Sequence, residues 1–192
     1  LCLLSLSPLI AKEDHQAEAQ YAALEQVLTL PTQGILKQKD NGFVYLDVSN
    51  EFITSIAPLV ELPGELRTLP TSSKSLGSHI SVFYEKEEIL PEELGETFSF
   101  EVKEIRSFTI HTRDGLKKLW TIALNAPELE SLRKKYECSP KLQGHDFHIT
   151  LGKQMPTGPN DWQENLELSP FNFSDDPTGD LLAEGDFMIV EN

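Results

Sequence analysis

Two four-residue patterns in the chain combine a histidine with a hydroxyl group at the same spacing. Residues 79–82 read His-Ile-Ser-Val and residues 148–151 read His-Ile-Thr-Leu. On a β-strand, side chains two positions apart share a face, so each histidine would point the same way as the hydroxyl residue that follows it. The aliphatic residues between them would point into a core. The candidate site residues are His79, Ser81, His148 and Thr150.

These residue types suit the cleavage of a phosphodiester bond. An unperturbed histidine has a pKa of about 6.5, so it can accept or donate a proton near neutral pH. We expect His79 and His148 to supply one general base and one general acid, in an order that the sequence leaves open. Ser81 and Thr150 would donate hydrogen bonds to the non-bridging phosphate oxygens. Such a set needs no metal ion and no cofactor.

Two plainer interpretations compete with this one. Either pattern alone is typical of a histidine on an ordinary half-buried strand, and it is the recurrence that favours a functional pair. His145 and His148 also form a His-x-x-His pair, which could bind a metal ion from a helix. Gly144 before the pair and the β-branched residues after it favour a strand, where positions three apart face opposite ways. We therefore expect no metal site.

The paired patterns resemble those of the two-histidine phosphoesterase superfamily, which includes the 2′,5′ RNA ligase-like and 2′,3′-cyclic nucleotide phosphodiesterase groups. The resemblance covers roughly residues 40–153 and rests on the two tetrads and the order of elements. It implies an α+β, bilobal fold, with two antiparallel β-sheet lobes flanked by helices around a central cleft. It also implies that His79 and His148 are the catalytic pair.

We expect a metal-independent phosphodiesterase that hydrolyses a small nucleotide or an RNA end through a 2′,3′-cyclic or 2′,5′ linkage. The alternative is a non-catalytic module of the same fold that binds a nucleotide or a protein. The acidic composition supports this alternative. The sequence indicates neither an oligomeric state nor whether ligation occurs.

Charge is distributed unevenly along the chain. The 192 residues carry 16 Lys and Arg against 31 Asp and Glu, a net charge of −15. Residues 154–192 hold nine acidic residues and no Lys or Arg, which leaves a net charge of −6 on the first 153. Such a surface repels a long polyanion, so we expect a small substrate and no duplex nucleic acid. No internal stretch is long and apolar enough to span a bilayer.

The hydrophobic periodicity predicts mixed secondary structure, with each histidine on a strand. Helices are expected over residues 13–30, 50–60 and 127–136. Strands are expected over residues 43–48, 79–84, 97–102, 105–111, 119–124 and 147–152. Residues 62–78 are rich in Pro, Gly and Ser and are expected to be mostly loop.

Further residues could join the site. Tyr45 could stack on a nucleotide base, although packing between elements is the plainer interpretation. Trp120 alternates with aliphatic residues in the manner of a core residue. Lys153 should lie on the strand face opposite Thr150 unless Gly152 bends the chain. Loop cations and one further histidine are weaker candidates: Lys74, Arg113 and His111.

The two ends differ in composition from the centre. Residues 1–11 are apolar and turn polar at residues 12–14, which is typical of the end of a secretory signal peptide. We expect a truncated signal peptide over 1–11, the phosphoesterase-like domain over 12–153 and an acidic C-terminal extension over 154–192. The protein would then be secreted or periplasmic; a docked apolar segment of a cytoplasmic protein is the alternative. Cys2 and Cys138 form neither a disulfide framework nor a metal pattern.

Overall fold

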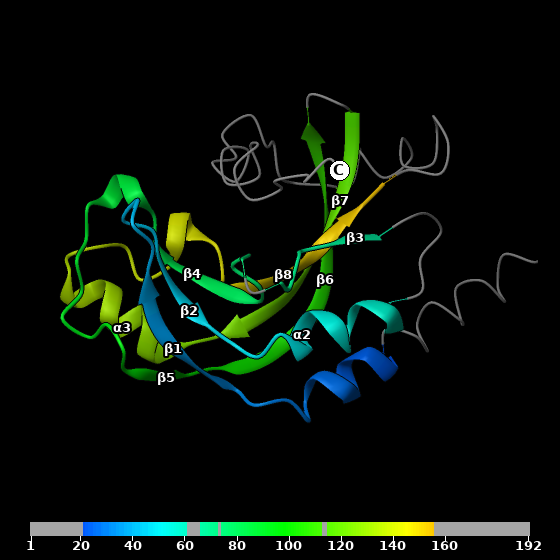
Figure 1. Ribbon diagram of the computed structural model, residues 1–192, viewed down its shortest axis with the longest axis horizontal. Helices are drawn as coiled ribbons and strands as arrows, with labels where there is room; N and C mark the ends of the chain where they lie inside the picture. Colours follow the sequence, from blue (N-terminus) through cyan, green and yellow to red (C-terminus); the bar gives the residue numbers. More distant parts are fainter. Residues whose placement is uncertain (1–20, 61–65, 73, 113–114, 156–192) are drawn as a thin grey trace, which may run out of the picture.

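The computed structural model describes residues 21–60, 66–72, 74–112 and 115–155 (Figure 1). The expected signal peptide over 1–11 and nearly all of the acidic extension over 154–192 lie outside these residues. Within the described part of the chain, no helix is long and apolar enough to cross a membrane.

The described residues form a mixed structure in which strands dominate. The strands are β1 (Gln33–Gln38), β2 (Val44–Asp47), β3 (Leu66–Thr68), β4 (His79–Phe83), β5 (Thr97–Ser99), β6 (Glu101–Thr112), β7 (Gly115–Asn125) and β8 (His148–Gln154). The α-helices are α2 (Glu51–Thr54) and α3 (Pro127–Lys135), and residues 21–27 are also helical. Short 3₁₀ turns follow at η1 (Ala57–Leu59), η2 (Glu85–Glu87) and η3 (Leu142–Gly144).

All eight strands belong to one antiparallel sheet. Its order is β5-β1-β2-β4-β8-β7-β6, and β3 pairs with β8 beside this path. The two edge strands, β5 and β6, are separated in the chain by Phe100 alone. The sheet therefore curls until its edges approach each other, and it resembles a nearly closed barrel (Figure 1).

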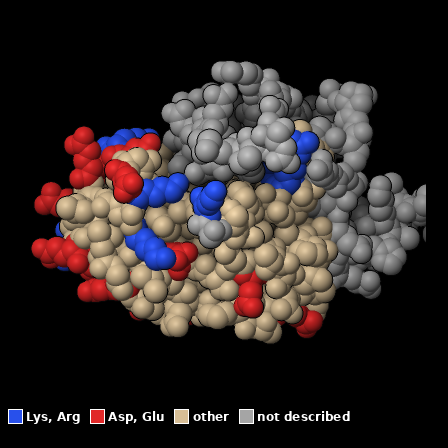
Figure 2. Space-filling view, in the orientation of Figure 1, with Lys and Arg blue, Asp and Glu red and all other residues tan. Residues whose placement is uncertain are grey.

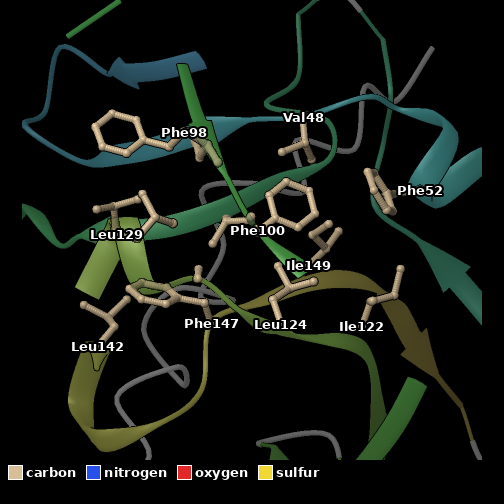
Figure 3. Packing of buried hydrophobic residues seen from close by; sticks show 14 of the residues in the cluster. Val48, Phe52, Phe98, Phe100, Ile122, Leu124, Leu129, Leu142, Phe147 and Ile149 are labelled. Atoms are coloured by element: carbon tan, nitrogen blue, oxygen red, sulfur yellow. The ribbon is translucent and has the colours of Figure 1, made fainter. Parts of the chain in front are cut away.

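The hydrophobic core follows from the strand alternation. Leu46, Ile80, Ile149 and Ile122 are fully buried on four neighbouring strands, and the residues before and after each of them belong to the opposite face. Aromatic and aliphatic side chains from the helices and from the β5–β6 junction complete this cluster; Figure 3 shows them, and Phe52, Phe98, Phe100 and Leu129 belong to them. The core thus occupies one face of the sheet, and the two histidines lie on the other.

Helix α3 has the expected composition for its position. Pro127 stands at its first turn, where its missing N–H costs nothing, and the basic residues of the last turn suit the negative end of the helix dipole. Leu129 and Leu132 bury its inner side, and Arg133 is buried with them. The Arg133 guanidinium donates to the Val82 carbonyl at 2.5 Å and so ties α3 to β4.

The structure agrees with the expected fold class and differs in detail. The α+β prediction is confirmed, and the strands that carry the histidines form. Two strands were missed: β1, and β3 inside the segment that its Pro and Ser content marked as loop. The described residues form one continuous sheet rather than two separate lobes. Pairing is least extensive between β4 and β8, where the single register pair joins Ile80 and Ile149.

Candidate active site

The two histidine strands lie side by side in the middle of the sheet. Ile80 of β4 is opposite Ile149 of β8, and both are fully buried in the core. In this antiparallel register His79 lies opposite Thr150 and Ser81 lies opposite His148, all on the other face. His79 and His148 are then diagonal neighbours, with Cα atoms about 7 to 8 Å apart. All four candidate side chains are half-buried.

The strand register extends this arrangement into two parallel rows across the sheet. One row, called here the His79 row, contains Asp47, His79, Thr150, Thr121 and Arg106. The other, called the His148 row, contains Tyr45, Ser81, His148, Ala123 and Glu104. Each histidine therefore has a hydroxyl residue directly beside it on the neighbouring strand.

Both imidazoles are held by the same kind of contact. The Nδ1 of His79 lies 2.9 Å from the carbonyl oxygen of Gly77, and the Nδ1 of His148 lies 3.2 Å from that of Asp146. A carbonyl oxygen only accepts hydrogen bonds, so each Nδ1 must carry the proton. In each ring Nε2 is consequently the nitrogen that gains or loses a proton.

The surroundings of His148 favour its neutral form. Burial lowers the pKa of His148 below the ordinary value of 6.5; the hydrogen bond to the Asp146 carbonyl opposes this effect, and the charges of Arg106, His79 and His145 lower the pKa further. The same interactions show that Arg106 and His79 lie within electrostatic range of the His148 ring. At neutral pH His148 is therefore suited to accept a proton.

His79 lies among aromatic rings instead. The rings of Phe43 and Tyr45 each meet the His79 imidazole edge to face, with centroids 6.1 Å away. Phe43 and Tyr45 also stack on each other at 5.8 Å. Tyr45, expected to stack on a base or to pack between elements, thus packs against the histidine while remaining half-buried.

Two ion pairs to Asp146 hold the segment before β8 in place. Lys103 and Lys141 bind the two carboxylate oxygens of Asp146 at 2.8 Å and 2.5 Å. Hydrogen bonds from these two lysines lower the pKa of Asp146 to about 2. Because the Asp146 carbonyl accepts a hydrogen bond from His148 Nδ1–H, this clamp helps to hold the ring in place.

The sequence analysis missed two residues that lie near the histidines, Thr121 and Arg106. Thr121 is fully buried, and its Oγ1 has no hydrogen-bond partner among the described residues. Thr121 lies opposite Thr150 on one side and opposite Arg106 on the other. The alternation of Trp120 with aliphatic residues already places Thr121 away from the core, but the pairing with Arg106 requires the β6–β7 register.

A β-bulge brings Lys153 to the histidine face. Thr150 pairs with Thr121, whereas Gly152 pairs with Trp120, so Leu151 is an extra residue on β8. Leu151 and Gly152 are both buried, and Lys153 is half-buried like His148 and Thr150. The condition attached to Lys153, that Gly152 bends the chain, is therefore met.

The remaining candidates lie elsewhere or outside the described side chains. Trp120 is buried in the core and donates to Gln154 at 3.0 Å. Lys74 and His145 are exposed. The side chains of His111 and Arg113 lie outside the part that the structure describes. Among the described residues, no group of three or more His, Cys, Asp or Glu could hold a metal ion.

A small cavity lies beside His148. It has a volume of about 20 Å³, near that of one water molecule, and Ser81, Tyr84, Phe147 and His148 are among its lining residues. Larger hollows of about 520 Å³ beside α3 and about 350 Å³ beside η1 contain neither histidine.

Comparison with known proteins gives one result. A family model described as "Swiss Army Knife, 2H phosphoesterase domain" matches residues 44–156, more than half of the chain. No curated protein and no solved structure matches. The matched range contains both histidine tetrads, the strands that carry them and the β6–β7 hairpin. The chain belongs to the 2H phosphoesterase family, as its two histidine tetrads indicated.

Proposed function

We propose that this protein hydrolyses a phosphodiester in a small nucleotide or at an RNA end, through a 2′,3′-cyclic or 2′,5′ linkage, by metal-independent acid–base catalysis. The observation that carries the proposal is the diagonal placement of His79 and His148 on one face, each with Nδ1 bound to a carbonyl. Family membership supports phosphoester hydrolysis in general. The choice of bond and substrate is ours.

The lowered pKa of His148 supports its role as the general base. Its neutral Nε2 takes a proton from a water molecule as the water oxygen attacks phosphorus. The bond from phosphorus to the ribose oxygen breaks, and His79 Nε2–H gives its proton to that departing oxygen. The products are a phosphomonoester and a free hydroxyl. Proton exchange with solvent then restores both rings.

The hydroxyl groups of Ser81 and Thr150 position the phosphate. Each lies beside a histidine of the neighbouring strand, at a suitable place to donate to a non-bridging oxygen. Such donors stabilise the extra negative charge of the transition state without reorganising. Tyr45 remains a candidate contact for a base or ribose at the edge of this site.

The test is hydrolysis of a panel of nucleoside 2′,3′-cyclic phosphates by wild type and by His79→Ala and His148→Ala. We expect each variant to lose about 100- to 10,000-fold in kcat, the range typical of a lost general acid or base. The exposed neighbour His145 supplies a matched control, since His145→Ala should keep nearly full activity. Activity should also survive EDTA.

Two outcomes would count against the proposal. If both histidine variants match wild type, the assignment of the catalytic pair is wrong. If wild type hydrolyses no member of the panel and still binds its nucleotides, the protein is better described as the binding module considered above.

A further inference from the structure

Two cations lie next to each other on the histidine face, at one side of Thr150. Strand β3 pairs with β8 so that Arg67 is opposite Lys153. On the other face, Leu66 lies opposite the buried Gln154 and packs against the core. Arg67 and Lys153 therefore project from the same face as the two histidines.

This placement depends on Gly152. The bulge at Leu151 and Gly152 returns Lys153 to the histidine face, as described above. A Cβ at Gly152 would collide with the Arg67 carbonyl oxygen and lie 2.7 Å from the Thr68 Cα. Only glycine lets β3 approach β8 this closely, so the residue that builds the bulge also brings Arg67 into place.

The charge of this region contrasts with that of the chain. The protein carries a net charge of −15, and Figure 2 shows acidic side chains gathered at the end where Figure 1 draws α3. Figure 2 also shows one group of Lys and Arg side chains over β3 and the end of β8, apart from those that lie among the acidic side chains and near the centre of this face. Lys153 and Thr150 are on the same strand and face, so these cations lie beside the position proposed for the reacting phosphate.

We propose that Arg67 and Lys153 form a subsite for a second phosphate group of the substrate. The inference rests on the proposed function and narrows its substrate class to a short nucleotide that carries a phosphate besides the reacting one. A guanidinium binds phosphate through two parallel hydrogen bonds, and an ammonium adds a point charge. Acidic surroundings disfavour a longer polyanion, so the ligand is a small one.

The experiment compares the binding of two product analogues by calorimetry. The probes are adenosine 3′,5′-bisphosphate and adenosine 3′-monophosphate, which differ by one phosphate. Wild type should bind the bisphosphate about tenfold more tightly, the size expected for one charge-assisted contact. Arg67→Gln and Lys153→Gln should each remove most of this preference and leave binding of the monophosphate nearly unchanged.

Lys134→Gln is the matched control, because Lys134 is an exposed cation on α3. It changes the net charge by the same amount and should retain the preference. Circular dichroism and thermal unfolding would establish that each variant folds as wild type does. Since Arg67 is exposed and Lys153 half-buried, we expect both glutamine variants to fold.

The results separate this inference from the proposed function. Equal binding of the two probes by wild type, binding of neither, or a preference that survives in both glutamine variants would overturn the subsite. If wild type hydrolyses cyclic nucleotides but binds the bisphosphate no more tightly than the monophosphate, the subsite alone is refuted. A clear bisphosphate preference that both variants lose, in a protein that hydrolyses nothing, would refute the catalytic proposal alone.

Discussion

The strands β4 and β8 carry the same motif and hold their rings through the same contact, from Nδ1 to the carbonyl two residues earlier. Around these rings the two strands differ. His79 is flanked by the edges of two aromatic rings, whereas burial and the charge of Arg106 act on His148. A repeated motif can thus present two like groups in different environments, and the proposed division into acid and base rests on that difference.

The two strands are also anchored differently. The end of β4 depends on the buried Arg133, which binds the Val82 carbonyl and the Glu87 carboxylate. The start of β8 depends on Asp146, whose two lysine partners are partly exposed. A buried ion pair is costly to break and a partly exposed one is not. We therefore expect the loss of Arg133 to lower the free energy of unfolding more than the loss of a lysine partner of Asp146.

The largest effect on stability is expected for Arg133→Met. This change removes the guanidinium that donates to the Glu87 carboxylate and to the carbonyl groups of Val82 and Ser139, and it should cost about 3 kcal/mol of unfolding free energy. Denaturant unfolding measures the loss. Lys134→Met, one residue further on the exposed side of α3, should stay within about 0.5 kcal/mol of wild type. A similar loss in both variants would contradict the account.

A smaller loss is expected for Gly152→Ala on the β8 side. The added methyl group meets the backbone of β3, so β3 must shift, at a cost of about 2 kcal/mol. Thermal or denaturant unfolding checks this value. The same variant should weaken the bisphosphate preference, because both cations move. A variant as stable as wild type would show that β3 does not pack as described.

The smallest expected effect is a shift in the pH dependence of kcat/KM. It tests whether the surroundings of His148 differ from those of His79 as described. Because its surroundings lower the pKa of His148, the acidic limb of the kcat/KM profile should lie below pH 6.5. Arg106→Gln removes a cation that lowers this pKa, so the limb should move to higher pH, whereas Lys134→Gln should leave it in place. A limb that stays or moves to lower pH would argue against the role of Arg106.

The same pKa has a consequence for stability. Below pH 6.5 the unfolded chain takes up a proton at residue 148 that the folded protein resists. The contribution of His148 to stability is therefore present above the unfolded pKa and is lost as the pH falls through the folded one. Unfolding experiments between pH 7 and pH 5 should show this decrease in wild type and less of it in His148→Ala.

Local patterns predicted much of the fold, because alternation alone puts a residue on one face of its strand. His79, Ser81, His148 and Thr150 share a face as expected. The short strand β3 could not be found this way. Its three residues are flanked by loop-forming ones, and pairing with β8 rather than propensity makes it a strand.

The sequence also could not predict which residues strand pairing brings near the histidines. Thr121 and Arg106 reach the His79 row only through pairing across β8, β7 and β6. Lys153 depends on a bulge that a glycine permits and that strand periodicity alone does not signal. The proposed order of acid and base was open for the same reason, since the proposal rests on burial and on the charge of Arg106.

The most direct test of the two separate roles compares leaving groups. Thymidine 5′-(p-nitrophenyl) phosphate releases nitrophenolate, which needs no proton, whereas a nucleoside 2′,3′-cyclic phosphate releases a ribose oxygen that does. With His79 as the acid, His79→Ala should lose about 100-fold or more on the cyclic substrate and little on the nitrophenyl ester, while His148→Ala should lose activity on both. Equal losses on both substrates in both variants, or the reverse pattern, would contradict the account.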